Sequence, residues 1–506
     1  MKRAADMQSP KQRVFRKTSE FHNTYMSKDE DDSLKRESDE DSGFEPSGLD
    51  DLTDLDSRSA VEDETSSENG FLKEEELVQH ILSLVPPENA EQARKDAHEA
   101  FGILPEFLKN ATKGALRTGD CGRSQAERPP WLDLDKFHRG QKFARDHFFG
   151  VFYSQLLSLF VLFSFAEGLK PMIITGKSST PFAAFKRYLS TGIRVRNWYT
   201  EDPWTEGTSA YKDIRVVRQM HRTVRERINK SSYEEVDQAT RIPNAWCPAR
   251  ESLLEDFRYT CPAPAPGQCW YMTNSARLTG INQTDMAITQ FGFLGLVILH
   301  PQRFGIHYAS DEDLEAFCHL WRGLGYLLGI EDEYNFCRGN LQDVQQRSRD
   351  LIEFWVKPNL RNVIPEWEHL MRCVVEGVRY YFPGSSFEIA LYYLTDVLEL
   401  HMPRLYASMS YRSCIRLFIL KVMFSFASRF RRVQNFLNRW LNDAIDRAMN
   451  FTNEELEERR ERSANSVLEK SFYSSSEKAG DECFYENFIS SASSSSLGVP
   501  LVSSNN

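Results

Sequence analysis

A histidine occupies the middle of the apolar stripe of one predicted helix. Ile214, Val217, His221, Val224 and Ile228 follow one another at helical spacing, and four of the five are β-branched aliphatic residues. Arginines stand to the sides of the stripe, at Arg215, Arg218, Arg222, Arg225 and Arg227. An imidazole on a core-facing stripe is either a hydrogen-bonded structural group or a ligand for a metal.

Two roles account for a histidine in this position. In the first, His221 is a core residue whose ring nitrogens bind a backbone carbonyl or a carboxylate. In the second, the neutral ring is an axial ligand of haem iron, because a haem site combines one nitrogen ligand with otherwise apolar walls. Arginines beside the helix would then pair with the haem propionates.

A second histidine raises a different metal chemistry. His319 lies four residues after Glu315, and three acidic residues follow at 331–333, which are residue types of a di-iron carboxylate site. That site requires Glu-x-x-His twice, a spacing that Glu366 and His369 show once. We therefore expect the glycines of this helix to allow close packing and the acidic residues to form a solvated turn.

The elements that must position these residues are helices. Apolar stripes at helical period run through residues 71–85, 90–104, 136–174, 180–200, 214–228, 284–300, 310–330 and 411–441, and alternating strand patterns are scarce. Ser310, three residues before Asp313, predicts a capped helix start. The apolar run from Val151 to Ala166 is short for a bilayer span and indicates a buried core helix. The predicted fold class is all-α.

Composition divides the 506 residues into three parts. Residues 1–70 are rich in Ser, Asp, Glu, Lys and Arg and cannot bury enough apolar surface to offset the entropy of ordering. Residues 452–506 are similar, with SSASSSSLGVP near their end. We predict one helical domain over residues 71–451, with its main motifs in 136–340, between two disordered tails.

Charge and cysteine usage exclude several classes of protein. The net charge of −11 leaves no basic nucleic-acid surface, so we expect no nucleic-acid partner. Nine scattered cysteines without a CxxC pair favour a reducing compartment. The first residues, MKRAADMQSPKQRVFRK, lack the apolar segment of a secretory signal, so we expect a cytoplasmic protein. Neither GxxxxGK[ST] nor GxSxG occurs.

Four ordered motifs resemble one family. FAAFKRYLSTGIRV, EDPWTEGTSAYKDIRVVRQMHRTVRERI, INQTDMAITQFGFLGLVIL and FCHLWRGLGYLLGIEDEYN look like the catalytic domain of the ER-bound oxygenase mpaB and latex-clearing rubber oxygenases. The resemblance covers roughly residues 136–340 and continues more weakly to about 440. It implies a globin-like helical core around haem b, which cleaves an isoprenoid C=C bond with O₂.

The resemblance also assigns residues to the haem. An arginine, a threonine four residues later and the axial histidine thirty residues beyond stand here as Arg187, Thr191 and His221. His221 is then the proximal iron ligand. Arg187 is expected to pair with a propionate or polarise the distal pocket, and Thr191 to bond bound oxygen or water. Without the resemblance, Arg187 would only pair with an acid and Thr191 would only bond a backbone carbonyl.

One position departs from the family. The rubber oxygenases carry a distal lysine just before the threonine, and this chain has Ser190. A serine cannot charge or ligate the distal site as a lysine can, so a small isoprenoid or other unsaturated lipid is a better candidate substrate than rubber. Two alternatives remain: a haem-binding sensor or carrier without turnover, and a helical interaction protein without the cofactor.

The stretch 411–441 combines bulky apolar residues with seven Lys and Arg residues. Such a segment can lie in a membrane interface. It can equally cover the core with its arginines turned outward. The family name implies association with the endoplasmic reticulum, so 411–441 is the candidate for peripheral contact with that membrane.

Overall fold

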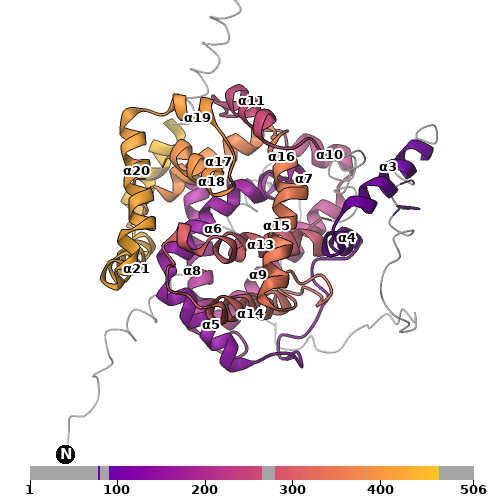
Figure 1. The fold of residues 1–506 in the computed structure, drawn as a ribbon, viewed down its shortest axis with the longest axis horizontal. Coiled ribbons are helices and arrows are strands. Elements are labelled where there is room, and N and C mark those ends of the chain that lie inside the picture. Colours follow the sequence, from indigo (N-terminus) through magenta and orange to yellow (C-terminus); the bar gives the residue numbers. More distant parts are fainter. Residues whose placement is uncertain (1–77, 80–81, 83–89, 265–279, 385, 466–506) are drawn as a thin grey trace, which may run out of the picture. The chain divides into compact units, whose positions relative to one another are not determined.

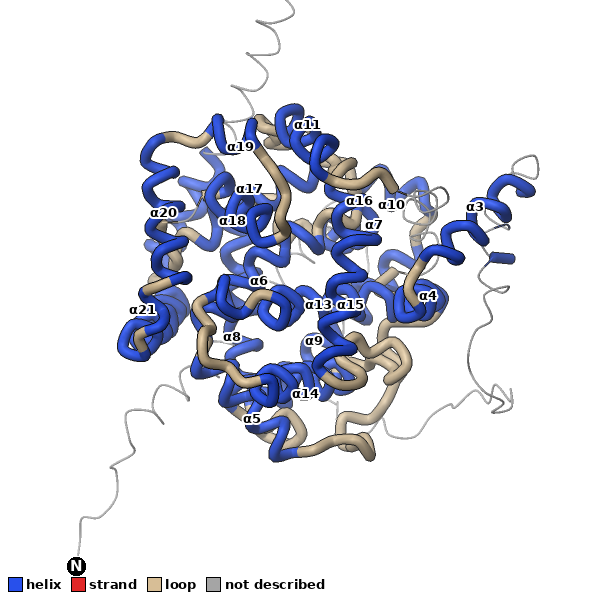
Figure 2. The backbone as a smooth tube through the Cα atoms, in the orientation of Figure 1, coloured by secondary structure: helices blue, strands red, loops and turns tan. Residues whose placement is uncertain are grey.

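The computed structural model describes residues 78–79, 82, 90–264, 280–384 and 386–465. They belong to the second of the two units that contacts define in the chain, Met1–Lys73 and Glu74–Asn506. The regular elements of the described residues are helices (Figure 1, Figure 2). The described residues contain no strand, and their β-type pairing is an isolated bridge between Thr118 and Asn282. The all-α prediction is confirmed, and the predicted tail of residues 1–70 lies outside the described residues.

The helices follow one another along the chain. The first half contains α3 (Ala90–Ile103), α4 (Glu106–Lys113), η2 (Gly114–Leu116), α5 (Leu134–Asp146), α6 (Phe148–Leu162), α7 (Ala166–Ile174), α8 (Pro181–Thr200), α9 (Ser209–Lys230), α10 (Tyr233–Ala239) and α11 (Arg250–Thr260). The second half contains α13 (Gln283–Leu299), η4 (Pro301–Phe304), α14 (Asp311–Leu327), α15 (Leu341–Leu351), the π-helix η5 (Ile352–Val356), α16 (Lys357–Leu360), α17 (Pro365–Val378), α18 (Phe387–Val397), α19 (Pro403–Ser408), α20 (Tyr411–Ser425), η6 (Ala427–Arg429) and α21 (Arg431–Met449).

Side-chain caps fix the starts of the helices that carry the candidate residues. Thr180 caps α8 and Thr208 caps α9, and each hydroxyl accepts a hydrogen bond from an amide of the first turn. Ser310 and Asp313 form the capping box at the start of α14 that the sequence predicts. These starts are local signals, because each cap satisfies amides that have no partner within the helix.

The apolar segment predicted within 136–174 forms three helices, α5, α6 and α7. Most residues of α6 are buried, and α6 packs against α13, so the expectation of a buried core helix is confirmed. The chain then bends by 106° between α6 and α7. Among the described helices none is by itself long and apolar enough to cross a membrane, while the bent α6–α7 pair passes that test jointly.

The prediction of a disordered tail from residue 452 is wrong for its first part. Residues 453–465 form a helix. The Thr452 hydroxyl and the Glu455 carboxylate accept hydrogen bonds from each other's amides, at 3.2 and 2.8 Å, which caps the helix start. Phe451 packs against Phe185 of α8, and Arg459 lies 3.7 Å above the Phe451 ring. The cap and the aromatic contact stabilise this helix despite its polar composition. The rest of the predicted tail, residues 466–506, lies outside the described residues.

One close helix contact joins α5 to α14. A Cβ atom added at Gly140 of α5 would lie 2.2 Å from the carbonyl oxygen of Ala316 in α14. The two backbones therefore meet at a point where only glycine fits.

Replacing Gly140 with alanine should lower the free energy of unfolding by about 2 kcal/mol, because the new methyl group must push α5 away from α14. Gly168 in α7 is the matched control, since a Cβ atom there would meet nothing closer than Phe165 Cβ at 3.6 Å. Gly168→Ala should leave stability unchanged or raise it by about 0.5–1 kcal/mol. Urea denaturation of the two variants checks this, and equal effects would contradict the close approach.

Candidate functional site

Helices α8 and α9 are joined by one buried carboxylate. Asp213 near the start of α9 accepts a hydrogen bond from Asn197 Nδ2 of α8 at 2.8 Å. The guanidinium of Arg194, also in α8, lies 3.7 Å from the same carboxylate, and both side chains are almost completely buried. The pairing holds the two helices in register, so residues further along each helix have fixed neighbours across the contact.

His221 lies on α9, where its side chain is half-buried. Burial, together with the positive charges of Arg187 and Arg225, lowers the pKa of His221 to about 4, while the charge of Asp120 acts in the opposite direction. The ring is therefore neutral at pH 7, with a lone pair on one nitrogen. Because the charge of Arg187 acts on this pKa, the α8 arginine and the α9 histidine lie in the same region of the structure.

No hydrogen bond reaches the ring of His221 from the described residues. The other two histidines that the sequence singled out are bonded. His319 Nε2 accepts the Asp133 amide hydrogen at 3.1 Å. His369 Nδ1 accepts the Trp246 amide hydrogen at 2.9 Å, and its Nε2 lies 3.0 Å from the Ser179 carbonyl oxygen. The structural role therefore fits His319 and His369, whereas the described chain supplies no such partner for His221.

The apolar stripe of α9 is incompletely packed. Ile214 is fully buried, but Val217, Val224 and Ile228 keep accessible surface beside His221. These residues share one helix face, because they recur at three- and four-residue intervals. An apolar face that keeps accessible surface leaves room for an apolar group.

Two other helices show the same feature. On α6 the half-buried residues Phe152, Gln155, Leu159 and Leu162 fall on one face, while the remaining residues of the helix are mostly buried. On α13, half-buried Asp285, Ile288 and Phe293 share a face with exposed Thr289. A Cβ atom at Gly192 of α8 would lie 3.7 Å from Phe152, and one at Gly292 of α13 would lie 2.5 Å from Leu162. Phe152 and Leu162 belong to the accessible face of α6, so this face borders α8 on one side and α13 on the other.

Arg187 binds neutral groups in this structure. Its Nη1 donates to Ser178 Oγ at 3.3 Å, and its Nη2 lies 2.6 Å from Met172 Sδ. No carboxylate of the described residues pairs with Arg187. The arginine therefore brings a positive charge to the neighbourhood of His221 without an acid to neutralise it there.

Thr191 and Ser190 are both engaged within α8. The Thr191 hydroxyl donates to the Arg187 carbonyl at 3.0 Å, which is the local bond that the sequence offered as the alternative to a catalytic role. The Ser190 hydroxyl accepts a hydrogen bond from Arg194 Nη1 at 2.9 Å. At the position of the family's lysine, this chain therefore places a hydroxyl that is bonded to a guanidinium.

Three further residues belong to this region. Arg225 follows His221 by one helical turn, and its Nη1 is buried without a hydrogen-bond partner among the described residues. Tyr188 bonds Ser178, and burial raises its pKa. The Tyr381 hydroxyl is buried near Tyr188 and also has no partner in the described chain; burial raises its pKa. The four-residue spacing between His221 and Arg225 could have identified Arg225 from the sequence. No sequence pattern points to Tyr381.

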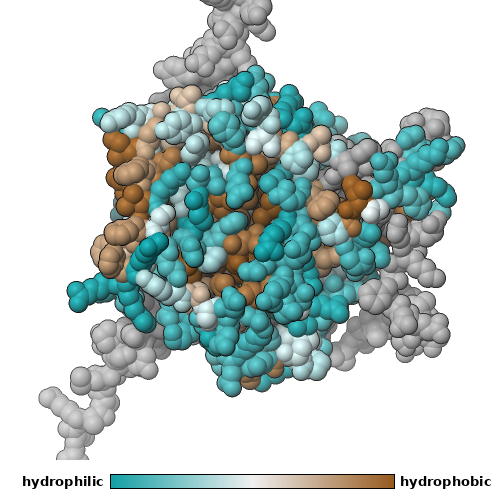
Figure 3. Space-filling view, viewed as in Figure 1, coloured by the Kyte–Doolittle hydropathy of each residue, from teal (hydrophilic) through white to brown (hydrophobic). Residues whose placement is uncertain are grey.

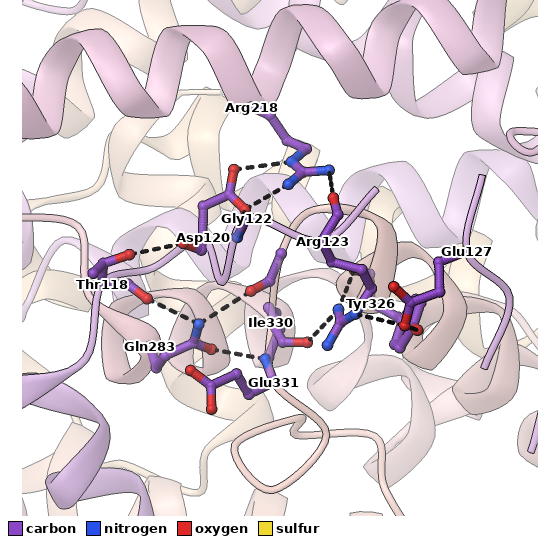
Figure 4. A network of polar contacts seen from close by, with 11 residues as sticks. Thr118, Asp120, Gly122, Arg123, Glu127, Arg218, Gln283, Tyr326, Ile330 and Glu331 are labelled. Carbon is purple, nitrogen blue, oxygen red and sulfur yellow. Dashed lines mark hydrogen bonds and ion pairs between the residues drawn. The ribbon is translucent and has the colours of Figure 1, made fainter. Parts of the chain in front are cut away.

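A polar network fixes α9 to the segment that holds Asp120 and Arg123 (Figure 4). Asp120 accepts hydrogen bonds from Arg218 Nε at 2.9 Å and Nη2 at 2.6 Å, and Arg218 Nη1 donates to the Arg123 carbonyl at 2.7 Å. Arg123 in turn donates to the carbonyls of Tyr326 and Ile330 at 2.9 and 3.2 Å. Helix α9 is thereby tied to the C-terminal end of α14.

The carboxylate of Asp120 is charged in this network. Burial alone would raise its pKa, but hydrogen bonds from Arg218 and from the Gly122 amide hold the pKa of Asp120 below its usual value. Only 5% of the Asp120 side chain is exposed. The ion pair therefore lies in a partly desolvated environment, where loss of one partner is costly.

The di-iron alternative finds no support in the described residues. They contain no group of three or more His, Cys, Asp or Glu side chains placed to hold a metal ion. Glu315 bonds Lys136, and Asp332 bonds Arg322 at 2.9 Å. These carboxylates are engaged in ion pairs, as expected of a structural surface.

Asp120→Asn should lower the free energy of unfolding by about 3 kcal/mol at pH 7, because it leaves Arg218 buried without a counter-charge. The pKa of Asp120 is lowered in the folded protein, so its contribution exists above the unfolded pKa and is lost as pH falls through the folded value. The difference from wild type should therefore shrink below about pH 4. Asp146→Asn, which breaks an exposed pair with Lys142, should cost under about 1 kcal/mol in the same denaturation experiment.

His221→Gln should make the protein less sensitive to acid. An unfolded histidine binds a proton near pH 6.5, whereas burial lowers the pKa of folded His221 to about 4. Between these values the unfolded state binds more protons, so wild-type stability falls by about 1.4 kcal/mol per pH unit as the pH drops. Urea denaturation at about pH 7 and pH 4.5 should show a shallower loss in His221→Gln than in wild type or in the exposed control His401→Gln. Equal losses in all three proteins would show that folded His221 titrates normally.

The sequence matches no family model and no curated protein. Among solved structures, the latex clearing protein LCP in the closed state is similar to this chain, with a TM-score of 0.39 and 18% sequence identity. The match covers 68% of this chain and 80% of that chain. The similarity to that protein is distant.

Proposed function

We propose that this protein binds haem b through His221 and uses it to oxidise or cleave a C=C bond of a hydrophobic isoprenoid or lipid with O₂. The observation that carries the proposal is the state of His221. The ring is neutral, it keeps accessible surface, and it receives no hydrogen bond from the described residues. A neutral imidazole with an available nitrogen is the form that binds iron.

The surrounding residues fit a haem. The half-buried apolar side chains of α6, α9 and α13, such as Leu159, Val224 and Phe293, supply walls for a flat apolar ring. The buried Nη1 of Arg225 has no hydrogen-bond partner in the described chain and suits a propionate carboxylate, because an arginine binds carboxylates through charge-assisted hydrogen bonds. Arg187 adds a second positive charge near His221. These residues are candidates to hold the group, with His221 on the iron.

A bound haem would supply the activation of dioxygen, and the chain would supply binding, orientation and a dry site. The apolar side chains of α6 and α13 exclude water and hold an alkene by its apolar surface. Ser190 does not carry charge, and Arg194 holds its hydroxyl at 2.9 Å. This favours a small unsaturated lipid over polyisoprene, whose cleavage in the resembling family goes with a lysine at this position.

A haem sensor or carrier without turnover is the second candidate. The observation that favours it is the engagement of both hydroxyls near the distal position. Thr191 donates to the Arg187 carbonyl at 3.0 Å, and Ser190 accepts from Arg194. The Thr191 hydroxyl donates its proton within its own helix, so that proton is not available to a ligand of the haem.

An absorption spectrum of the full chain, expressed with haem supplied, tests the cofactor. We expect a Soret band and a pyridine haemochrome in wild type, no Soret band in His221→Ala, and an unchanged band in the exposed control His401→Ala. Arg225→Gln should weaken haem affinity by about tenfold or more, because a hydrogen bond to a charged group contributes about 1.5–3 kcal/mol. A colourless but folded wild type, as judged by circular dichroism, would overturn the haem proposal.

Oxygen consumption then separates the two candidates. With unsaturated isoprenoid lipids added, an oxygenase consumes O₂ and forms a carbonyl or hydroxylated product. A sensor or carrier binds haem with the same spectrum and forms no product.

A further inference from the structure

Helix α20 and the start of α21 carry an exposed apolar stripe. The outward-facing side chains are Tyr411, Ile415, Phe418, Ile419, Val422, Phe426, Phe430 and Phe436, with exposed fractions from 41% to 82%. Those in and directly after α20 recur at three- and four-residue intervals and fall within an arc of about 100° on the helix. Figure 3 shows apolar surface along the edge of the molecule where Figure 1 places α20 and α21.

The opposite face of α20 is firmly packed. Leu417 and Phe424 are buried, and the Phe424 ring contacts Tyr153 of α6 and Tyr393 of α18, with centroids 5.3 and 5.8 Å apart. Gln434 of α21 extends this attachment, since its Nε2 donates to the Gly305 carbonyl at 2.8 Å. The helix has therefore buried one apolar face in the core and presents a second one outward.

The charge around the stripe has one sign. Residues 402–442 contain no Asp or Glu, although the whole chain has a net charge of −11. Lys421 pairs with Asp396 at 3.1 Å. The exposed arginines beside the stripe are Arg412, Arg416, Arg429, Arg431, Arg432 and Arg439. A basic rim around bulky apolar and aromatic residues is the pattern of a helix that lies in a membrane interface.

We propose that the outer face of α20 and the start of α21 binds the surface of an anionic lipid bilayer. Phenylalanine and isoleucine side chains enter the headgroup and acyl boundary, and the arginines meet anionic headgroups. The sequence left open whether 411–441 turns its apolar residues or its arginines outward, and in the structure both face outward around a separate buried side. The inference does not depend on the haem.

A second copy of the chain is a poorer occupant. A symmetric dimer through this face would bring two predominantly basic surfaces together, because a twofold interface pairs each patch with itself. Anionic lipid supplies the opposite charge and the apolar layer at once. A single helix of 15 residues is too short to cross the bilayer, so the attachment is peripheral.

Vesicle flotation of the full chain tests the proposal. We expect binding to phosphatidylcholine vesicles that contain phosphatidylserine, much weaker binding to phosphatidylcholine alone, and loss of binding at high salt. The double variant Phe418→Ser/Ile419→Ser should bind anionic vesicles at least about tenfold more weakly, because two large apolar side chains no longer enter the interface. Tyr259→Ser/Tyr308→Ser is the matched control: these aromatic residues are 77% and 75% exposed elsewhere, and their loss should not change binding.

The charge contribution has its own variant. Arg412→Gln/Arg416→Gln should weaken binding to anionic vesicles by about tenfold and reduce its salt dependence. Circular dichroism is the control for folding. We expect each variant to be folded, because every substituted side chain is exposed. The proposal is overturned if folded wild type does not bind anionic vesicles, or if the Phe418/Ile419 variant binds as wild type does. Two other results would also overturn it, because they would give the surface another occupant. In the first, wild type is a dimer by light scattering and the Phe418/Ile419 variant is a monomer. In the second, the variant loses binding to an acidic protein but keeps binding to vesicles.

Discussion

The place of His221 depends on one buried carboxylate. Asp213 receives the Asn197 amide at 2.8 Å and lies 3.7 Å from the Arg194 guanidinium, so α8 and α9 are joined near their common loop. From that junction the two helices carry Arg187 and His221 to neighbouring positions. The Asp120–Arg218 pair adds a second attachment on the other side of α9. Between these two attachments, the apolar stripe of α9 is held in place even though it is incompletely packed.

The surroundings of His221 differ from those of the other two histidines that the sequence singled out. His319 and His369 accept backbone amide hydrogens, which is how a folded protein satisfies an imidazole that it uses for support. Burial lowers the pKa of all three histidines, so this shift alone does not separate them. The hydrogen-bond environment does, because of these three rings only that of His221 has no hydrogen bond to the described residues.

Sequence patterns predicted the helices where local signals determine them. The helix at 180–200 appears as α8, and the Ser310–Asp313 pair caps α14, because caps and helical periodicity act within a few residues. The division of 136–174 into three helices and the order of residues 453–465 depend on tertiary contacts, such as that between Phe451 and Phe185. The stripe around His221 was visible in the sequence. The absence of hydrogen bonds to its ring was not, since it depends on which groups other helices bring near.

The depressed pKa of His221 also removes competition between protons and a metal. An ordinary histidine must release a proton before it can bind a metal at acidic pH, at a cost of about 1.4 kcal/mol for each pH unit below its pKa. With a pKa of about 4, most His221 rings are neutral and keep their lone pair at about pH 5 and above. In the proposed haem site, the availability of this nitrogen would therefore be set by access to the site rather than by acidity.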